Sequence, residues 1–399
     1  MKVTVIGQGY VGQTIAFYAS KMHSVTGFDV NEKLVEELNH GQSNIEGLNV
    51  DLLKTALSNG KYLATNDASL LDGSDVIVIA VPTPLSSDRK PDLSYLESAC
   101  KLIAKIMTND TLIINESTSF PGTVRNFIKP TIEKYAPERN HLYAVSPERV
   151  DPGRQDWNQT NTPRLFAGLN AEATTKTKLF YSAFCENLVE VSSPEVAEAA
   201  KLFENSFRQV NIALVNEFAR ISHALGISVR ETLNAANTKP YGFMKFEPSA
   251  GVGGHCIPVD PTYLATTARE HGVTANFIEL ANQVNLEMGK YIVNRVIADK
   301  GNSLNNKKVQ IIGVAYKPNI SDVRESPANE IYDALVVSGA QVTWYDPLVE
   351  KWRENKSCEI GSEITIVVTL HDVIDTDELL KKSSYVFDTT GKISGATQL

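Results

Sequence analysis

The sequence lacks any apolar run long enough to cross a membrane. The stretch VIVIAVP at residues 76–82 is far shorter than the roughly 20 residues that a spanning helix needs. The start of the chain, MKVTVIGQGYVG, also lacks the longer apolar run and the cleavage site of a secretory signal. We therefore expect no membrane partner and a cytoplasmic location.

Cysteine and positive charge are scarce as well. The four cysteines are Cys100, Cys185, Cys256 and Cys358. They lie far apart without a C-x-x-C pair, which fits neither a disulfide framework nor a zinc site. The 38 Lys and Arg residues are outnumbered by 47 Asp and Glu residues, so the net charge is −9. The cysteine spacing leads us to expect no metal site. Because no basic excess is available for phosphate contacts, we also expect no nucleic acid partner.

Strands and helices alternate along the first half of the chain. With 399 residues, of which 42% are hydrophobic, the chain is long enough for two or three domains with ordinary cores. Buried β-branched runs predict strands at residues 3–6, 76–81, 111–115 and 142–145. Residues 92–107 place apolar side chains at helical spacing and predict a crossover helix. This alternation is typical of an α/β fold with a parallel sheet.

A long amphipathic segment, residues 193–225, predicts a helix that connects two parts of the chain. It opens with Ser-Pro-Glu, and proline is favoured in the first turn of a helix. Turn-forming residues at 300–306 predict a boundary. Beyond it, the pattern predicts strands at residues 309–315, 341–344, 364–368 and 384–388, and a helix at residues 327–337. We therefore expect a second α/β unit.

A glycine-rich turn, G-x-G-x-x-G, follows the first predicted strand and opens a helix. In such a turn Gly7 permits the tight bend, Gly9 lets a pyrophosphate approach the backbone, and Gly12 lets helix and strand pack closely. The helix N-terminus supplies N–H donors. Asp29 ends the second strand about 20 residues further on, where a carboxylate accepts ribose hydroxyls and repels a 2′-phosphate. The pattern predicts a site for NAD rather than NADP.

Glycines surround one cysteine in the segment GVGGHCIPVDP, residues 251–261. They permit backbone conformations closed to other residues, so a substrate can approach Cys256 closely enough for the thiol to attack a carbonyl. Asp260, four residues later, is placed to orient water or a protonated partner. From these residues alone two interpretations stay open, because a lone cysteine is also common as a small buried apolar residue. The neighbouring His255 is interpreted as structural.

Lys201 and Asn205 lie four residues apart on the predicted long helix, so both project from one face. An ammonium and an amide side by side form a donor pair suited to a developing oxyanion. A solvated lysine beside an exposed asparagine is the alternative. The Ala-rich surroundings indicate a packed helix and favour a functional pair.

Seven motifs in one order give the chain its resemblance to a known family. They are GQGYVG at 7–12 with its preceding strand, VPTP at 81–84, ESTSFPGT at 116–123, SPERVDPG at 146–153, AKLFEN at 200–205, GVGGHCIPVDP at 251–261 and KPNISDVRES at 317–326. The chain resembles the nucleotide-sugar 6-dehydrogenases, the UDP-glucose/UDP-N-acetylhexosamine dehydrogenase superfamily, nearly from end to end. The resemblance implies an NAD-dependent, four-electron oxidation of a sugar C6 hydroxymethyl group to a carboxylate.

In that family's mechanism Cys256 would be the nucleophile that forms a thiohemiacetal and then a thioester, which water releases as the uronate. The resemblance further implies that Lys201 and Asn205 hold the C6 oxygen, that Asp260 with Thr118 positions water, and that Glu148 acts as acid or base. These six residues form the expected catalytic set.

The resemblance also implies binding residues. For NAD they are Gly7, Gly9, Tyr10, Val11, Gly12, Asp29, Thr83, Thr118 and Arg324. For the UDP-sugar they are Glu148, Arg149, Lys201, Asn205, Lys239, Tyr241, Phe243, Gly253 and Lys317. Among these, Thr83 and Thr118 would flank the nicotinamide, Lys317 would contact the UDP, and Arg324 would reach the NAD pyrophosphate.

The implied architecture is two Rossmann-like domains joined by a long central helix around which two subunits dimerise. It divides the chain into an NAD-binding domain (1–192), a central helical region with the catalytic cysteine (193–300) and a UDP-sugar-binding domain (301–399). We expect a homodimer.

Departures within the superfamily bear on the sugar. The chain reads PERVDP at 147–152 where UDP-glucose enzymes usually have Pro-Glu-Phe-Leu and a second glutamate, and Val259 where they have lysine. SPERVDPG, TKPYGFM and GGHCIPVDP look most like the UDP-N-acetylglucosamine 6-dehydrogenases. UDP-N-acetylmannosamine, UDP-N-acetylgalactosamine and UDP-glucose stay open as substrates. Other candidate functions are a one-step dehydrogenase, which needs no cysteine, and a non-catalytic NAD-binding regulator.

Overall fold

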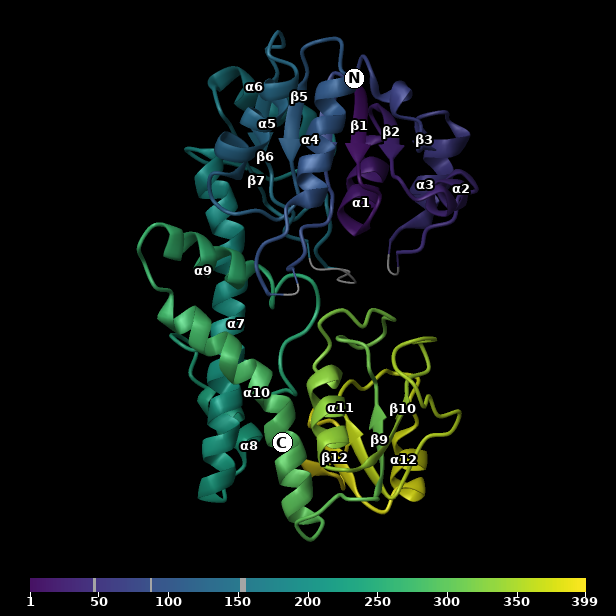
Figure 1. Cartoon of the computed structure of the whole chain (residues 1–399), viewed down its shortest axis with the longest axis vertical. Coiled ribbons are helices and arrows are strands. Elements are labelled where there is room, and N and C mark those ends of the chain that lie inside the picture. The colour runs from purple at the N-terminus through teal and green to yellow at the C-terminus, as the bar shows by residue number, and fades with distance from the viewer. Residues whose placement is uncertain (46–47, 87, 151–155) are drawn as a thin grey trace. The chain divides into compact units, whose positions relative to one another are not determined.

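Figure 1 shows the computed structural model, which describes residues 1–45, 48–86, 88–150 and 156–399. The chain divides into two compact units, Met1–Glu204 and Asn205–Leu399. The division falls inside helix α7 (Pro194–Leu225), the helix predicted at residues 193–225. Each unit has its own sheet and its own hydrophobic cores. Residues 151–153, the end of the SPERVDPG motif, lie outside the described residues.

The first unit is built on an eight-stranded sheet of order β3-β2-β1-β4-β5-β6-β7-β8. Its strands are β1 (Lys2–Ile6), β2 (Ser24–Phe28), β3 (Tyr62–Thr65), β4 (Val76–Ile79), β5 (Leu112–Asn115), β6 (Leu142–Val145), β7 (Arg164–Gly168) and β8 (Leu188–Glu190). All neighbours are parallel except β6 and β7, which are antiparallel. The strand order reverses beside β1, and in open α/β sheets ligands bind at such a switch point.

Helices cover both faces of this sheet. They are α1 (Tyr10–Ala19), α2 (Glu32–Asn39), α3 (Val50–Ser58), α4 (Ser94–Ile106), α5 (Lys129–Tyr135) and α6 (Ala171–Tyr181), with short turns η1 (Ala68–Leu71) and η2 (Val124–Ile128). Strand β4 shows why two covers are needed: Val76 and Val78 join one core, whereas Ile77 and Ile79 join the other. A strand buried on both faces reads as the continuous apolar run seen in the sequence.

The second unit contains a smaller, fully parallel sheet of order β10-β9-β11-β12-β13. Its strands are β9 (Lys308–Ile312), β10 (Gln341–Tyr345), β11 (Ile364–Val367), β12 (Val386–Asp388) and β13 (Thr397–Gln398). Its helices beyond α7 are α8 (Val229–Ala236), α9 (Asp260–Glu270), α10 (Asn276–Asp299), α11 (Ala328–Val337) and α12 (Thr376–Lys382). Helix α10 packs along α11, as Figure 1 shows, and both contribute to the core around Trp344.

The predicted α/β class with two sheet-containing units is confirmed. The predicted strands and helices occur with boundaries shifted by at most three residues, as for α4, which begins at Ser94 after Asp92 accepts its main-chain N–H. Within the described residues, no helix is long and apolar enough to span a membrane.

Candidate functional site

The glycine turn after β1 needs two of its glycines for packing and leaves the third facing open space. Gly7 adopts φ +90°, and a Cβ there would overlap the carbonyl oxygen of Ala80. A Cβ on Gly12 would overlap the carbonyl oxygen of Gly7. A Cβ on Gly9 would meet no atom within 4 Å. The backbone at Gly9 is therefore accessible to a ligand, as close approach of a pyrophosphate requires.

The N-terminus of α1 and the carboxylate of Asp29 complete this site. Gly9 precedes the helix and provides no side-chain cap, and Tyr10 and Val11, both half-buried, form its first turn. Asp29 follows β2, and its Oδ2 accepts a 2.8 Å hydrogen bond from the Gln8 N–H. Main-chain donors for phosphate and a fixed carboxylate for a ribose are what NAD requires, so the described residues fit this cofactor.

Lys201 and Thr118 are brought together in the first unit. Lys201 is 8% exposed, and its Nζ donates a 2.6 Å hydrogen bond to the Thr118 hydroxyl. One turn earlier on α7, Glu198 accepts main-chain N–H bonds from Gly122 (2.6 Å) and Val124 (3.1 Å). Burial raises the pKa of Glu198 to about 8, against the opposing effect of these donors. Helix α7 thus holds the ESTSFPGT loop through two side chains on successive turns.

Asn205 and Asp260 are brought together in the second unit. Asn205 Nδ2 donates a 2.6 Å hydrogen bond to Asp260 Oδ2, and Asp260 is buried at the start of α9. The sequence predicted Lys201 with Asn205 at one oxygen and Thr118 with Asp260 at one water. The contacts found here are Lys201 with Thr118 and Asn205 with Asp260. Each of these two hydrogen-bonded pairs therefore contains one donor side chain from α7.

The loop before α9 exposes the predicted nucleophile. Cys256 is exposed, and its carbonyl oxygen accepts the Asp260 N–H at 2.8 Å. Cys100 and Cys185 are buried, and burial raises the pKa of their thiols to about 12 and about 11. The exposure of Cys256 removes the alternative of a buried apolar residue. Among the four cysteines, Cys358 is the other exposed thiol.

Two glycines let this loop lie against the segment that follows β9. A Cβ on Gly253 or on Gly254 would come within 2.7 Å of the Tyr316 side chain, and Gly254 has φ +85°. The Gly254 N–H donates to the Arg324 carbonyl oxygen at 3.1 Å. The predicted binding residue Gly253 is therefore needed for packing within the second unit.

Arg324 lies in the neighbourhood of this loop. Its Nε donates to both oxygens of Asp322 at 3.0 Å, and this pair raises the pKa of Arg324, with smaller contributions from Tyr316 and Cys256. The guanidinium is 62% exposed and can reach an anion. Lys317, on the same segment, is half-buried.

Glu148 lies in a buried polar network that the sequence did not predict. Its Oε1 accepts the main-chain N–H groups of Arg149 and Val150, both at 2.6 Å. Its Oε2 accepts from Arg164 Nη2 at 3.0 Å and from Gln159. These donors fix the Glu148 carboxylate and the turn that follows β6.

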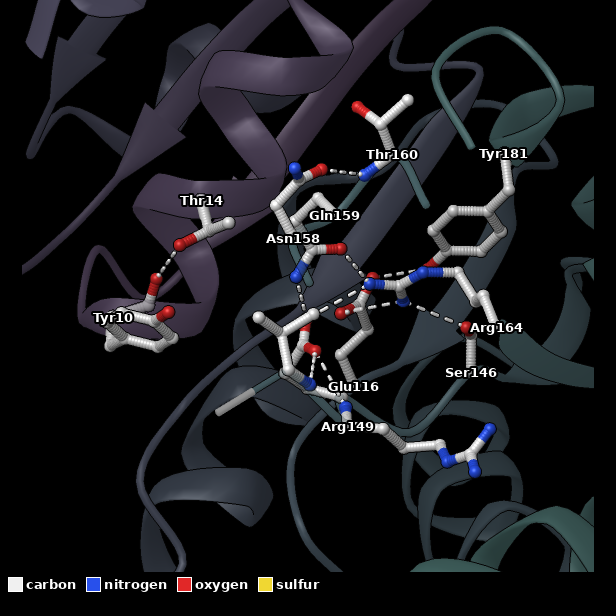
Figure 2. A network of polar contacts seen from close by, with 12 residues as sticks. Tyr10, Thr14, Glu116, Ser146, Arg149, Asn158, Gln159, Thr160, Arg164 and Tyr181 are labelled. Atoms are coloured by element: carbon white, nitrogen blue, oxygen red, sulfur yellow. Dashed lines mark hydrogen bonds and ion pairs between the residues drawn. The ribbon is translucent and has the colours of Figure 1, made fainter. Parts of the chain in front are cut away.

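Arg164, on β7, is the centre of this network. It is 4% exposed and lies between two carboxylates, with Nη1 3.2 Å from Glu116 Oε2 and Nη2 3.0 Å from Glu148 Oε2. Its guanidinium stacks 4.6 Å from the ring of Tyr181, whose hydroxyl donates to Glu116. Burial raises the pKa of Glu116 to about 7, although Arg164 opposes the shift. Figure 2 shows Glu116, Ser146 and Tyr181 converging on Arg164 from different elements.

The other residues predicted to bind the substrate are Arg149, Lys239, Tyr241 and Phe243. Arg149 forms a bidentate pair with Glu204 (2.7 and 3.1 Å) and donates to the Pro163 carbonyl oxygen. Tyr241 is 73% exposed, and Lys239 Nζ lies 5.0 Å from the centre of its ring. Phe243 is also exposed. Thr83, which was predicted to bind NAD, is buried.

Three family models match the chain in sequence. The UDP-glucose/GDP-mannose dehydrogenase family is matched by its NAD binding domain at residues 1–185, by its central domain at 195–298 and by its UDP binding domain at 310–394. Together they cover most of the chain.

Individual relatives agree with these matches. A UDP-N-acetyl-D-mannosamine dehydrogenase of Methanococcus maripaludis is 34% identical over 97% of this chain and 92% of its own length. A UDP-N-acetyl-D-glucosamine 6-dehydrogenase of Pseudomonas aeruginosa is 33% identical over 88% of this chain and 83% of its own. The structure of the UDP-D-ManNAc dehydrogenase from Pyrococcus horikoshii superposes with a TM-score of 0.89 at 31% identity, covering 100% of this chain and 98% of that one.

Proposed function

The chain belongs to the UDP-glucose/GDP-mannose dehydrogenase family and is an NAD-dependent nucleotide-sugar dehydrogenase, and from this premise we propose a specific reaction. The enzyme oxidises the C6 hydroxymethyl group of a UDP-N-acetylhexosamine to the carboxylate in two steps. In balance, one sugar, two NAD⁺ and one water give one uronate, two NADH and three protons. The observation that carries this proposal is the exposed Cys256 thiol on a glycine-rich loop. The carbonyl oxygen of Cys256 accepts the Asp260 N–H, and the Asp260 carboxylate accepts a hydrogen bond from Asn205.

The C6 alcohol first loses a hydride from its carbon and the proton of its hydroxyl, which gives the C6 aldehyde. The Cys256 sulfur then adds to the carbonyl carbon of this aldehyde, and the thiol proton passes to the carbonyl oxygen. The resulting thiohemiacetal loses a hydride and a proton to become a thioester. Water then cleaves the carbon–sulfur bond, which returns the thiol and releases the uronate. Bound NAD supplies the acceptor for both hydrides.

The remaining roles are assigned as the resemblance implies them. Lys201 and Asn205 present an ammonium and an amide, the donor types that stabilise a developing oxyanion. Asp260, held by Asn205, orients the attacking water together with Thr118. Glu148 takes the acid or base role that the resemblance implies, and the donors around its carboxylate hold it in one position.

The proposed sugar carries an acetamido group. The sequence favours UDP-N-acetylglucosamine, and the relatives include enzymes named for UDP-N-acetylglucosamine and for UDP-N-acetylmannosamine. Both assignments agree with the PERVDP segment, which lacks the second glutamate usual in UDP-glucose enzymes. The acetamido class is therefore proposed, with UDP-N-acetylglucosamine as its expected member.

We also propose a cytoplasmic homodimer, with the contact made by the central region 193–300. On α7, Phe207, Leu214 and Ile221 repeat every seven residues and are exposed, Leu214 by 64%. On α10, Phe277 is 81% exposed. A seven-residue apolar repeat is the pattern by which two helices pack against each other, so a second copy is the expected cover. A reducing compartment would keep Cys256 as a thiol.

The decisive experiment follows NADH formation to completion with UDP-N-acetylglucosamine, UDP-N-acetylmannosamine, UDP-N-acetylgalactosamine and UDP-glucose. Two NADH per acetamido sugar, with little from UDP-glucose, are expected. Cys256→Ser is expected to abolish uronate formation, whereas the matched control Cys358→Ser, which also removes an exposed thiol, is expected to retain it. One NADH per sugar would indicate the one-step dehydrogenase instead, and NAD binding without turnover on any of the four sugars would indicate the regulator.

A further inference from the structure

A buried aspartate–histidine pair lies at the carboxyl ends of the strands in the second unit. Asp346 follows β10 and His371 follows β11, and Asp346 Oδ2 lies 3.0 Å from His371 Nε2. Both side chains are fully buried. Asp346 also accepts four main-chain N–H groups, from Val314 and Ala315 on Oδ2 and from Leu348 and Val349 on Oδ1. Burial raises the pKa of Asp346, but the bond from His371 and these N–H groups outweigh it and hold that pKa below its ordinary value.

The hydrogen bonds of His371 show which of its ring nitrogens carries the hydrogen. Its Nδ1 accepts the Asn319 N–H at 2.8 Å. A neutral imidazole that accepts on Nδ1 carries its hydrogen on Nε2, so His371 donates to Asp346. The pair therefore connects the ends of β10 and β11 with the segment that follows β9.

That segment is held at both ends. At its start, Asp346 binds the N–H groups of Val314 and Ala315. At its far end, Asn319 adopts φ +64°, donates from Nδ2 to Asp372 and accepts the Asp372 N–H, at 2.8 and 2.9 Å. Lys317 lies between these two anchors, and Tyr316 packs on the glycines of the Cys256 loop.

We propose that Asp346 and His371 are positioning residues that hold this segment so that Lys317 meets the diphosphate of the UDP-sugar. The proposal rests on the proposed function, because it presumes a UDP-sugar bound to this unit. A lysine on an unanchored loop would lose more conformational entropy on binding than one whose backbone is already ordered. The pair acts on affinity for the nucleotide, not on the reacting carbon.

Two substitutions separate the two nitrogens of His371. His371→Asn keeps an acceptor near the position of Nδ1 and so retains the bond to the Asn319 N–H. His371→Gln keeps a donor near the position of Nε2, retains the bond to Asp346 and loses the bond to Asn319. Thr365→Val is the matched control, because Thr365 is buried on β11 and its hydroxyl forms a hydrogen bond with Ser383, which lies outside the segment.

The test measures the Kd of UDP by titration calorimetry, KM and kcat with the UDP-sugar, and Tm of each variant. For His371→Gln we expect Kd and KM to rise about tenfold with a smaller change in kcat. His371→Asn, which keeps the direct bond to the segment but loses the bond to Asp346, is expected to raise Kd less than His371→Gln does, and Thr365→Val is expected to stay near the wild-type Kd. A folded His371→Gln with wild-type Kd would overturn the proposal. The proposal would also be overturned if both histidine variants lowered Tm and kcat equally without a separate change in Kd. That result would indicate a merely structural role.

The same titration distinguishes failure of the proposal from failure of the proposed function. If the wild-type protein binds UDP and oxidises a UDP-sugar but His371→Gln is indistinguishable from it, only the positioning role is wrong. If the wild-type protein neither binds UDP nor reduces NAD with any of the four sugars, the proposed function fails and the positioning role fails with it.

Discussion

Asp29 and Asp346 occupy equivalent positions in the two units. Each follows the strand that pairs with the first strand of its unit, and each accepts a 2.8 Å hydrogen bond from the N–H that follows a left-handed glycine, Gly7 or Gly313. The two aspartates differ in burial and in whether a histidine is bonded to the carboxylate. Asp29 is half-buried, whereas Asp346 is buried beneath His371. The same backbone geometry therefore leaves a half-buried carboxylate in the first unit, as the predicted ribose contact requires, and anchors a loop in the second.

The glycine turn makes a prediction that separates binding from folding. Gly9→Ala places a methyl group in open space, so the protein should fold with an unchanged Tm while the Kd of NAD rises about tenfold or more. Gly12→Ala is the control for packing, because its methyl group would overlap the Gly7 carbonyl and lower Tm. Calorimetric titration with NAD and thermal unfolding test both. An unchanged Kd in Gly9→Ala would contradict the assigned pyrophosphate position.

Replacement of Lys201 tests the oxyanion role. Lys201→Met removes a buried ammonium that donates to Thr118, and we expect kcat to fall about 10²–10³-fold with a smaller effect on KM. Lys178→Met, at an exposed position on α6, is the matched control and should leave both constants unchanged. Steady-state kinetics with saturating NAD measure the difference. A rise in KM at constant kcat would show that Lys201 binds the ground state and the transition state equally well and does not act specifically on the oxyanion.

Stability should fall as the pH rises from about 4.5 to about 8. The pKa of Glu198 is raised to about 8 and that of Glu116 to about 7, in both cases first by burial. At these two carboxyl groups the folded protein binds more protons over this window than the unfolded chain, so their deprotonation favours unfolding. Tm measured by thermal unfolding is expected to be several degrees lower at pH 8.5 than at pH 5.

Glu198→Gln isolates one of these two groups. The amide cannot ionise, so the decline of Tm with pH should become shallower, although one of the two main-chain N–H groups loses its acceptor at every pH. Glu195→Gln is the control on the same helix, since the pKa of Glu195 is lowered, first by its hydrogen bond to Arg125. An identical slope in wild type and Glu198→Gln would refute the assignment.

Arg164 should be more important for stability than for chemistry. Arg164→Met leaves Glu116 and Glu148 buried without their shared cation, and loss of one partner of a buried ion pair costs about 3–5 kcal/mol. Urea unfolding measures the change in free energy. Adding Glu116→Gln to Arg164→Met removes one of the unpaired charges and is expected to recover part of the loss. No recovery would mean that the two carboxylates do not share Arg164 energetically.

The sequence by itself determined the features that depend on neighbours along the chain. The glycine turn, Asp29, the long helix α7 and the glycine loop around Cys256 all follow from local pattern, because glycine geometry and helical periodicity act over a few residues. The exposure of Cys256 was left open by the sequence and is a finding of the structure. The strand and helix types were predictable for the same reason.

Only the tertiary structure decided which side chains meet. Glu116, Glu148, Arg164 and Tyr181 come from the ends of β5 and β6, from β7 and from α6, and no spacing in the sequence relates them. The tertiary structure likewise decides three hydrogen bonds: Lys201 to Thr118, Asn205 to Asp260, and His371 to Asp346. Parallel strands gather their carboxyl ends at one edge of a sheet, so residues far apart in the chain become neighbours through strand order, which local propensity does not encode.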